Sequence, residues 1–265
     1  MQLAGATALV TGATGGLGSA IASALRQRGA ELIVSGRRAS ELDALAASLQ
    51  AETAVADLAV RAEVERLGTL ALEAGVDVLV ANAALPASGL LLDLTDEQID
   101  RMLDVNLRAP IMLAHALAPA LVARGRGHLV FVSSLSGKAA SRASSLYSAT
   151  KFGLRGFALA LRHDLAPHGV GVSLVAPGFI RDAGMFADSG VKLPPGAGTK
   201  TSGDVAAAVI RVIEADRAEL EVAPAALRAG TAFASLAPQL AASASRLAGS
   251  DRVSAEFAER QRDKR

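Results

Sequence analysis

The chain has 265 residues and a mass of 26.8 kDa, enough for one large α/β domain. Its formal net charge is only +1 and aromatic residues make up 3% of it. We therefore expect no nucleic-acid partner, because such a protein needs a basic face and aromatic stacking platforms. The absence of cysteine excludes disulfides, thiolate metal sites and a cysteine nucleophile, and suits a cytoplasmic protein. The start of the chain has no basic region, so we expect no signal peptide.

Short apolar runs of strand length alternate with helix-length segments along the chain. We expect strands at 6–10, 31–36, 52–56, 77–81, 127–133, 170–175 and 219–223. We expect helices near 16–28, 40–50, 60–74, 97–123, 147–166 and 203–215. This alternation predicts a doubly wound, mostly parallel sheet with helices on both faces. Glycine, proline and serine gather in 184–203, which predicts a mobile loop.

A glycine-rich turn, residues 11–18, follows the first predicted strand. Its spacing, G-x-x-x-G-x-G, is a variant of the dinucleotide-binding fingerprint. Glycines let the backbone approach a pyrophosphate, and the helix that begins there offers free N–H groups and the positive end of its dipole. The alternative is a plain glycine turn. The candidate cofactor contacts in this turn are Gly12, Thr14, Gly15, Gly16, Leu17 and Gly18.

Two arginines follow the second predicted strand. A turn that binds NAD expects a carboxylate here, to accept from the ribose 2′-hydroxyl. The chain has Arg37 and Arg38 instead, and guanidinium groups suit a 2′-phosphate through charge and geometry. The alternative is a pair of solvated charges. The sequence therefore favours NADP(H).

Three polar residues follow or interrupt apolar segments near the expected crevice. Asp57 follows the third strand, where it could accept from an adenine amino group or cap a helix. Asn82 ends the fourth strand, beside the point where such sheets bind ligands. Asn106 lies in a long apolar helical segment, where a buried amide must find hydrogen-bond partners. A water or a side chain that interrupts the helix would supply them, and structural capping is the alternative.

Tyr147 and Lys151 form the strongest candidate for catalysis. Four residues apart on a helix, they share one face. A phenol holds its proton to about pH 10, and a neighbouring ammonium makes that proton easier to give up. Such a phenol can act as a general acid or base. Ser134, at the end of a predicted strand, could hold the same substrate oxygen.

Other polar residues give weaker signals. The four histidines, His115, His128, His163 and His168, show no metal-ligand spacing with carboxylates, so we interpret them as structural or solvated and expect no metal. Lys138 and Arg142 precede Tyr147 and could meet an acidic group of a substrate, with a solvated loop as the alternative.

Taken together, these residues resemble the short-chain dehydrogenase/reductase family. The order and spacing of the motifs fit that family from the first residues to about residue 222. The matching motifs are TGATGGLG at 11–18, NAA at 82–84, DVN at 104–106, SS at 133–134, YSATK at 147–151 and PG at 177–178.

The resemblance implies a single-domain Rossmann-type sheet of seven parallel strands in the order 3-2-1-4-5-6-7. It implies hydride transfer between a nicotinamide cofactor and a carbonyl or secondary alcohol substrate, with Tyr147 as general acid or base. Lys151 would lower the Tyr147 pKa and bind the nicotinamide ribose, Ser134 would hold the carbonyl oxygen, and Asn106 would bind a water linked to Lys151. Further implied cofactor contacts are Leu58, Pro177, Gly178 and Ile180. A homotetramer or homodimer through the long helices 97–123 and 147–166 is also implied.

The chain departs from the family pattern at three places. The usual N-N-A-G motif is A-N-A-A here, so Ala84 has a Cβ where the family has a glycine. The family usually has a threonine where this chain has Asp182; a carboxylate there could accept from the nicotinamide amide, or point to solvent. We expect the cofactor-binding and catalytic domain to span 1–223 and a helical C-terminal extension to span 224–265. The extension is interpreted as a flap over the substrate cleft or a contact with a neighbouring subunit, with membrane-surface attachment as a minority alternative.

These observations predict an NADP(H)-dependent oxidoreductase that acts on carbonyl compounds or alcohols. The competing class is a non-catalytic nucleotide-sensing or scaffold protein on the same fold, because a fold does not fix function. The substrate itself cannot be deduced, since no motif in 184–203 or in the extension specifies it.

Overall fold

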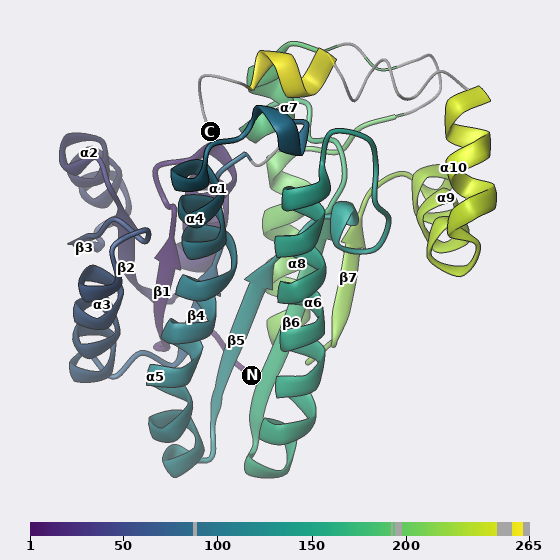
Figure 1. Cartoon of the computed structure of the whole chain (residues 1–265). Helices are drawn as coiled ribbons and strands as arrows, with labels where there is room; N and C mark the ends of the chain where they lie inside the picture. The colour runs from purple at the N-terminus through teal and green to yellow at the C-terminus, as the bar shows by residue number, and fades with distance from the viewer. Residues whose placement is uncertain (87–88, 192, 194–197, 248–255, 262–265) are drawn as a thin grey trace.

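The computed structural model describes residues 1–86, 89–191, 193, 198–247 and 256–261. Seven strands form one parallel sheet in the order β3-β2-β1-β4-β5-β6-β7 (Figure 1). The strands are β1 (Thr7–Thr11), β2 (Glu31–Gly36), β3 (Glu52–Val55), β4 (Val78–Ala81), β5 (Gly127–Val132), β6 (Val170–Pro177) and β7 (Glu219–Val222). The predicted order is confirmed, and every predicted strand end lies within two residues of the observed one.

Helices cover both faces of this sheet, as predicted, because the central strands are apolar on both sides. On one face lie α1 (Gly16–Gln27), α2 (Ala39–Leu49) and α8 (Ser202–Glu214). On the other face lie α3 (Arg61–Glu73), α5 (Ala109–Arg124) and α6 (Ser145–Leu165). Such burial of parallel strands on both sides explains their continuous apolar runs.

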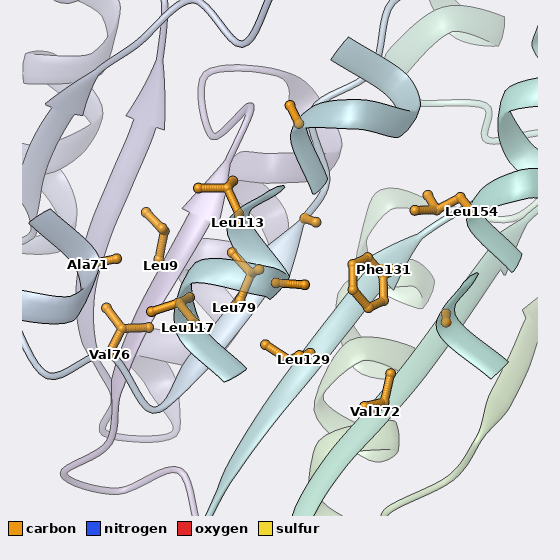
Figure 2. Close-up of a cluster of buried hydrophobic side chains, with 14 of the residues drawn as sticks. Leu9, Ala71, Val76, Leu79, Leu113, Leu117, Leu129, Phe131, Leu154 and Val172 are labelled. Carbon is orange, nitrogen blue, oxygen red and sulfur yellow. The ribbon is translucent and has the colours of Figure 1, made fainter. Parts of the chain in front are cut away.

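The register of the sheet aligns its core side chains in rows. Leu9 of β1 pairs with Leu79 of β4, Leu79 with Leu129 of β5, and Leu129 with Val172 of β6. All four belong to the cluster under α3, α5 and α6 (Figure 2). Because these strands are parallel, their carboxyl ends lie at one edge of the sheet, where the site lies.

The predicted helix at 97–123 consists of three parts. These are α4 (Asp96–Leu103), a π-helical turn (Asp104–Arg108) and α5. The whole stretch from Asp96 to Arg124 is long and apolar enough to cross a membrane by length and composition alone. Here its side chains Leu113, Leu117 and Leu121 are buried in the core, so the stretch is a core helix of this fold.

The chain beyond β6 contains helices that the apolar periodicity did not define. The predicted loop at 184–203 includes α7 (Gly184–Ser189), while residues 192 and 194–197 lie outside the described residues. The C-terminal extension forms α9 (Ala225–Leu236) and α10 (Pro238–Leu247), and residues 256–260 are helical too. The prediction of a helical extension is confirmed for these segments, and residues 248–255 and 262–265 are outside the described part.

Candidate active site

A cavity of about 910 Å³ opens at the carboxyl ends of the central strands. Its walls come from the turns after β1, β2, β3 and β4, the loop after β5, the first turns of α6 and the segment after β6. Every residue predicted to bind the cofactor lines this cavity. Ser134, Tyr147 and Lys151 line it as well, whereas Asn106 does not.

The glycine turn forms the floor of the cofactor end. Gly12 has φ +63°, a left-handed conformation that favours glycine. A Cβ on Gly18 would lie 2.2 Å from Gly12 O and 2.9 Å from Asn82 Nδ2, so the turn and the helix can approach only without that side chain. Gly15 is the N-cap of α1, and neither a side-chain cap nor an acidic residue occupies its first turn. The backbone N–H groups there are consequently suited to a phosphate.

Asn82 stabilises this turn from β4. Its Nδ2 donates to Thr11 O at 3.0 Å and to Gly12 O at 3.3 Å, and its backbone N–H donates to Thr11 Oγ1 at 3.1 Å. The amide thus holds β1 and β4 together at the crevice between them.

Arg37 and Arg38 lie at the tip of β2, on the cavity wall. Their side chains are 52% and 60% exposed. Arg38 pairs with Glu41 at 2.6 Å and donates to Thr14 Oγ1 at 3.4 Å, and Arg37 lies 3.9 Å from an oxygen of Asp57. Two guanidinium groups beside the glycine turn suit a phosphate on the adenosine ribose.

Asp57 is engaged by its neighbours. Its Oδ1 accepts from the Ala59 N–H at 3.0 Å and its Oδ2 from Arg101 Nη2 at 3.0 Å. Burial raises the pKa of Asp57, but these hydrogen bonds and the charges of Arg101 and Arg37 outweigh it, so the pKa is lowered overall. The alternative interpretation of Asp57 as a helix N-cap is wrong, because the N-cap of α3 is Val60.

Tyr147 and Lys151 lie on the first turns of α6, facing the end of β5. Lys151 is 2% exposed and its Nζ donates to Val132 O at 3.0 Å. The Nζ atom lies 5.7 Å from the centroid of the Tyr147 ring. Tyr147 itself is half-buried, and its phenol hydrogen-bonds the Ser134 side chain. The three polar groups therefore converge from one helix and one strand end.

Burial controls the protonation of both groups. It raises the pKa of Tyr147 to about 12, against a smaller lowering by the hydrogen bond with Ser134. It lowers the pKa of Lys151 to about 8. The expected lowering of the Tyr147 pKa by Lys151 is wrong for this structure, because removal from water dominates and the ammonium is directed to Val132 O.

Asn106 is buried in the π-helical turn between α4 and α5. Its Oδ1 accepts from the Leu85 N–H at 2.7 Å and its Nδ2 donates to Leu85 O at 3.0 Å. The amide finds its partners in the loop after β4, and a π turn is a common way to place a functional side chain. Asn106 thus positions a loop whose residues 82–86 line the cavity.

The end of β6 supplies Pro177, Gly178 and Ile180 to the cavity. Asp182 does not line it. Its carboxylate accepts from the N–H of Ser202 at 2.8 Å and from the Ser202 hydroxyl at 3.1 Å. The interpretation that Asp182 accepts from the nicotinamide amide is therefore not supported by its position.

The structure also brings residues to the cavity that no motif indicated. They come from the loop before α6, from α7, from α9 and from the C-terminal segment, and include Ala139, Met185, Phe186, Leu227, Thr231, Phe257 and Gln261. Arg142, which the sequence offered as a partner for an acidic group of a substrate, lines the cavity as well. Lys138 is turned away from any substrate, because it pairs with Glu219 and Glu221. His128 is a buried core histidine whose Nε2 lies 2.7 Å from Ser173 Oγ. Among the described residues, no group of three or more metal-ligand side chains occurs.

Comparison with known proteins identifies the family. A family model for short chain dehydrogenases matches residues 6–192. The dehydrogenase/reductase SDR family member 4 of Pongo abelii is 39% identical over 187 residues, 68% of this chain and 67% of its own length. The ketoacyl reductase HetN of a Nostoc species is 33% identical over 228 residues, 83% of this chain and 79% of its own.

A solved structure shares the fold and holds a cofactor. The short-chain dehydrogenase from Sphingobium yanoikuyae in complex with NADPH superposes with a TM-score of 0.76 at 29% identity, covering 82% of this chain and 87% of that one. The sheet order, the glycine turn and the 187-residue match to the Pongo abelii protein all indicate the same family. The chain therefore belongs to the short-chain dehydrogenase/reductase family of oxidoreductases.

Proposed function

We propose that the protein is an NADPH-dependent reductase of carbonyl compounds, which also oxidises the corresponding alcohols. The observation that carries this proposal is the convergence of Ser134, Tyr147 and Lys151 on the cavity that contains the glycine turn. A protein that only senses nucleotides has no use for a buried ammonium beside a phenol at the far end of the cofactor crevice.

The residues at the glycine turn and the tip of β2 would hold the cofactor. The uncapped N-terminus of α1 suits the pyrophosphate, and Arg37 and Arg38 suit a 2′-phosphate. When bound, NADPH supplies the hydride. The complexes of a related dehydrogenase with NADPH and of a metagenomic short-chain oxidoreductase with NADP support this choice.

A protonated Tyr147 could supply the proton that reduction of a carbonyl needs. A phenol with a pKa of about 12 keeps its proton at neutral pH, and reduction of a carbonyl needs a proton donor at the developing alkoxide. Ser134, already hydrogen-bonded to this phenol, would hold the same oxygen. Lys151, with a pKa of about 8, is mostly protonated at pH 7, and its ammonium would bind the nicotinamide ribose.

Asn106 would connect Tyr147 and Lys151 to solvent through a bound water. Its Oδ1 accepts one hydrogen bond and its Nδ2 donates one, both to Leu85. An amide has a further lone pair and a further hydrogen, which the water implied by the family resemblance would use. Replacement of the proton that Tyr147 gives up would follow this path.

The test is a screen of NADPH consumption over ketones, aldehydes and 3-oxoacyl thioesters. We expect turnover with at least one class, and the Tyr147→Phe variant should lose roughly a hundredfold or more in kcat while its NADPH affinity, measured by calorimetry, stays within about twofold. Retained activity in Tyr147→Phe would refute the role of the phenol. Tight NADPH binding without any turnover would favour the sensor or scaffold alternative.

We propose that the protein also assembles as a homodimer or homotetramer through α5 and α6. Phe152 on α6 is 43% exposed, although it is a large apolar side chain. Analytical ultracentrifugation of the wild type and of Phe152→Glu is the measurement, and a monomeric wild type would contradict the proposal.

A further inference from the structure

The substrate end of the cavity is completed by residues beyond the part of the chain that the family model matches. The family model ends at residue 192. Leu227 and Thr231 of α9, and Phe257 and Gln261 of the C-terminal segment, all line the cavity that contains Tyr147. We name these four residues the substrate wall. They belong to the extension, so the motifs that bind the cofactor say nothing about them.

Helix α9 packs closely against the active site. Leu227 contacts the core cluster under α5 and α6. A Cβ on Gly178 would lie 3.1 Å from Leu227 Cδ2 and 3.2 Å from Leu135 Cδ1. The absence of a side chain at Gly178 thus lets Leu227 approach the end of β6 and the residue that follows Ser134.

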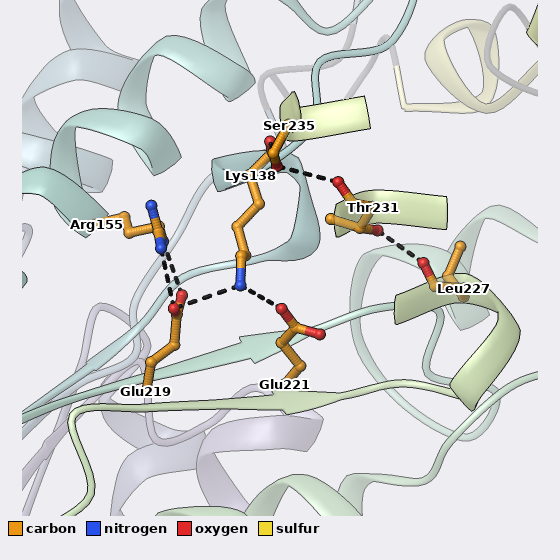
Figure 3. A network of polar contacts seen from close by, with 7 residues as sticks. All are labelled: Lys138, Arg155, Glu219, Glu221, Leu227, Thr231 and Ser235. Atoms are coloured by element: carbon orange, nitrogen blue, oxygen red, sulfur yellow. Dashed lines mark hydrogen bonds and ion pairs between the residues drawn. The ribbon is translucent and has the colours of Figure 1, made fainter. Parts of the chain in front are cut away.

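Polar contacts fix α9 to the loop that carries Ser134 (Figure 3). Ser235, in the last turn of α9, donates its hydroxyl to Lys138 O at 2.7 Å. Lys138 pairs in turn with Glu219 and Glu221 of β7. Arg155 of α6 donates to both oxygens of Glu219, at 2.8 and 3.1 Å. The wall is consequently attached to the same loop and the same helix that position the catalytic groups.

Side chains of the C-terminal segment, residues 256–261, donate hydrogen bonds to backbone carbonyls of α7. Gln261 is fully buried and its Nε2 donates to Met185 O at 2.6 Å. Arg260 Nη1 donates to Ser189 O at 3.3 Å. Both acceptors are main-chain carbonyls of α7, which follows the cofactor-binding end of β6. The arrangement places Phe257 on the cavity.

The surface around this end is mainly hydrocarbon. Its large side chains are Leu135, Phe179, Met185, Phe186, Leu227 and Phe257. Of the two basic residues before Tyr147, Lys138 is paired with Glu219 and Glu221, whereas Arg142 lines the cavity. An apolar group gains affinity against the hydrocarbon side chains by leaving water.

We propose that the substrate wall selects carbonyl compounds with a bulky apolar substituent, such as a long alkyl or an aryl group. The inference rests on the proposed reductase function and names its substrate class. The carbonyl would meet Ser134 and Tyr147 while the apolar substituent lies against α9 and Phe257.

The test compares methyl ketones of increasing chain length, from acetone to methyl heptyl ketone, in the presence of NADPH. In the wild type kcat/KM should rise roughly fourfold per methylene until the wall is covered. Leu227→Ala should lower kcat/KM for methyl heptyl ketone at least about tenfold and change it for acetone by less than about twofold. Leu236→Ala is the matched control, since Leu236 lies on the same helix but is 87% exposed and does not line the cavity.

Calorimetry separates this inference from the proposed function. Methyl heptyl ketone is titrated into the NADPH-saturated protein, its Leu227→Ala variant and its Phe257→Ala variant. Binding that weakens in both variants, without turnover in any of the proteins, would retain the wall and reject the reductase. If chain length affects neither binding nor kcat/KM, or if Leu227→Ala and Leu236→Ala behave alike, the inference is overturned.

Discussion

The buried ammonium of Lys151 should make the protein less stable than it could be. The side chain is 2% exposed, and burial lowers its pKa from 10.5 to about 8. At about 1.36 kcal/mol per pKa unit, holding the charge inside the protein at pH 7 costs roughly 3 kcal/mol. Replacing Lys151 by methionine would remove this cost. It would also remove the hydrogen bond to Val132 O, which is worth about 1–2 kcal/mol. We therefore expect Lys151→Met to be inactive and about 1–2 kcal/mol more stable at pH 7.

The stability of the wild type should change with pH in a direction that the lowered Lys151 pKa determines. Because the pKa of Lys151 is lower in the folded protein than in the unfolded chain, the unfolded chain binds more protons between about pH 8 and 10.5. The wild type should gain stability as pH rises through this window, recovering about 2 kcal/mol by pH 9.5. Lys151→Met lacks this gain, so its stability advantage over the wild type should shrink or reverse by pH 9.5.

Urea unfolding at pH 7 and pH 9.5 measures both effects. Lys138→Met is the matched control, because the same substitution there leaves Glu219 and Glu221 without their counter-charge. With the Lys138 side chain 16% exposed, we expect a loss of about 1–3 kcal/mol at pH 7. A Lys151→Met protein that is less stable than the wild type at pH 7, with a difference that does not change with pH, would refute the reasoning.

Three further predictions concern the cofactor and the core. Arg38→Ala should weaken NADPH binding about 10–100-fold and leave NADH binding nearly unchanged, and equal losses for both cofactors in calorimetry would contradict a 2′-phosphate contact. Gly18→Ala places a Cβ 2.2 Å from Gly12 O and should abolish measurable NADPH binding, whereas Gly156→Ala, with nothing within 4 Å, should bind normally. Burial lowers the pKa of His128 from 6.5 to about 4. The neutral imidazole therefore contributes stability that is fully present above pH 6.5 and is lost as the pH falls toward 4. Urea unfolding should show a loss of about 2 kcal/mol between pH 7 and pH 5, and a flat profile would show that His128 is not held neutral.

The sheet and the cofactor crevice could be predicted because local patterns determine them. Parallel strands buried on both faces leave apolar runs, and the glycines at 12 and 18 are required by a positive φ and by a 2.2 Å approach. The spacing of Tyr147 and Lys151 is that of a helix face. Each of these features depends on residues close together in sequence.

Features that depend on distant partners could not be predicted. The sequence indicated that Asn106 needs hydrogen-bond partners, but the partner, Leu85, lies 21 positions away and the π turn has no sequence signature. The raised pKa of Tyr147 results from burial, which depends on the elements packed around it and not on its spacing from Lys151. Contacts such as Ser235 to Lys138, 97 positions apart, likewise leave no local pattern.

The cavity has walls from both ends of the chain, Gly12 at one and Gln261 at the other. The residues that we propose to hold the cofactor lie between Gly12 and Ile180, so all of them are synthesised before α9 and the C-terminal segment. The proposed cofactor crevice would therefore be complete in sequence before the substrate wall exists. Grafting a foreign extension after β7 is accordingly the most direct route to a redesigned selectivity.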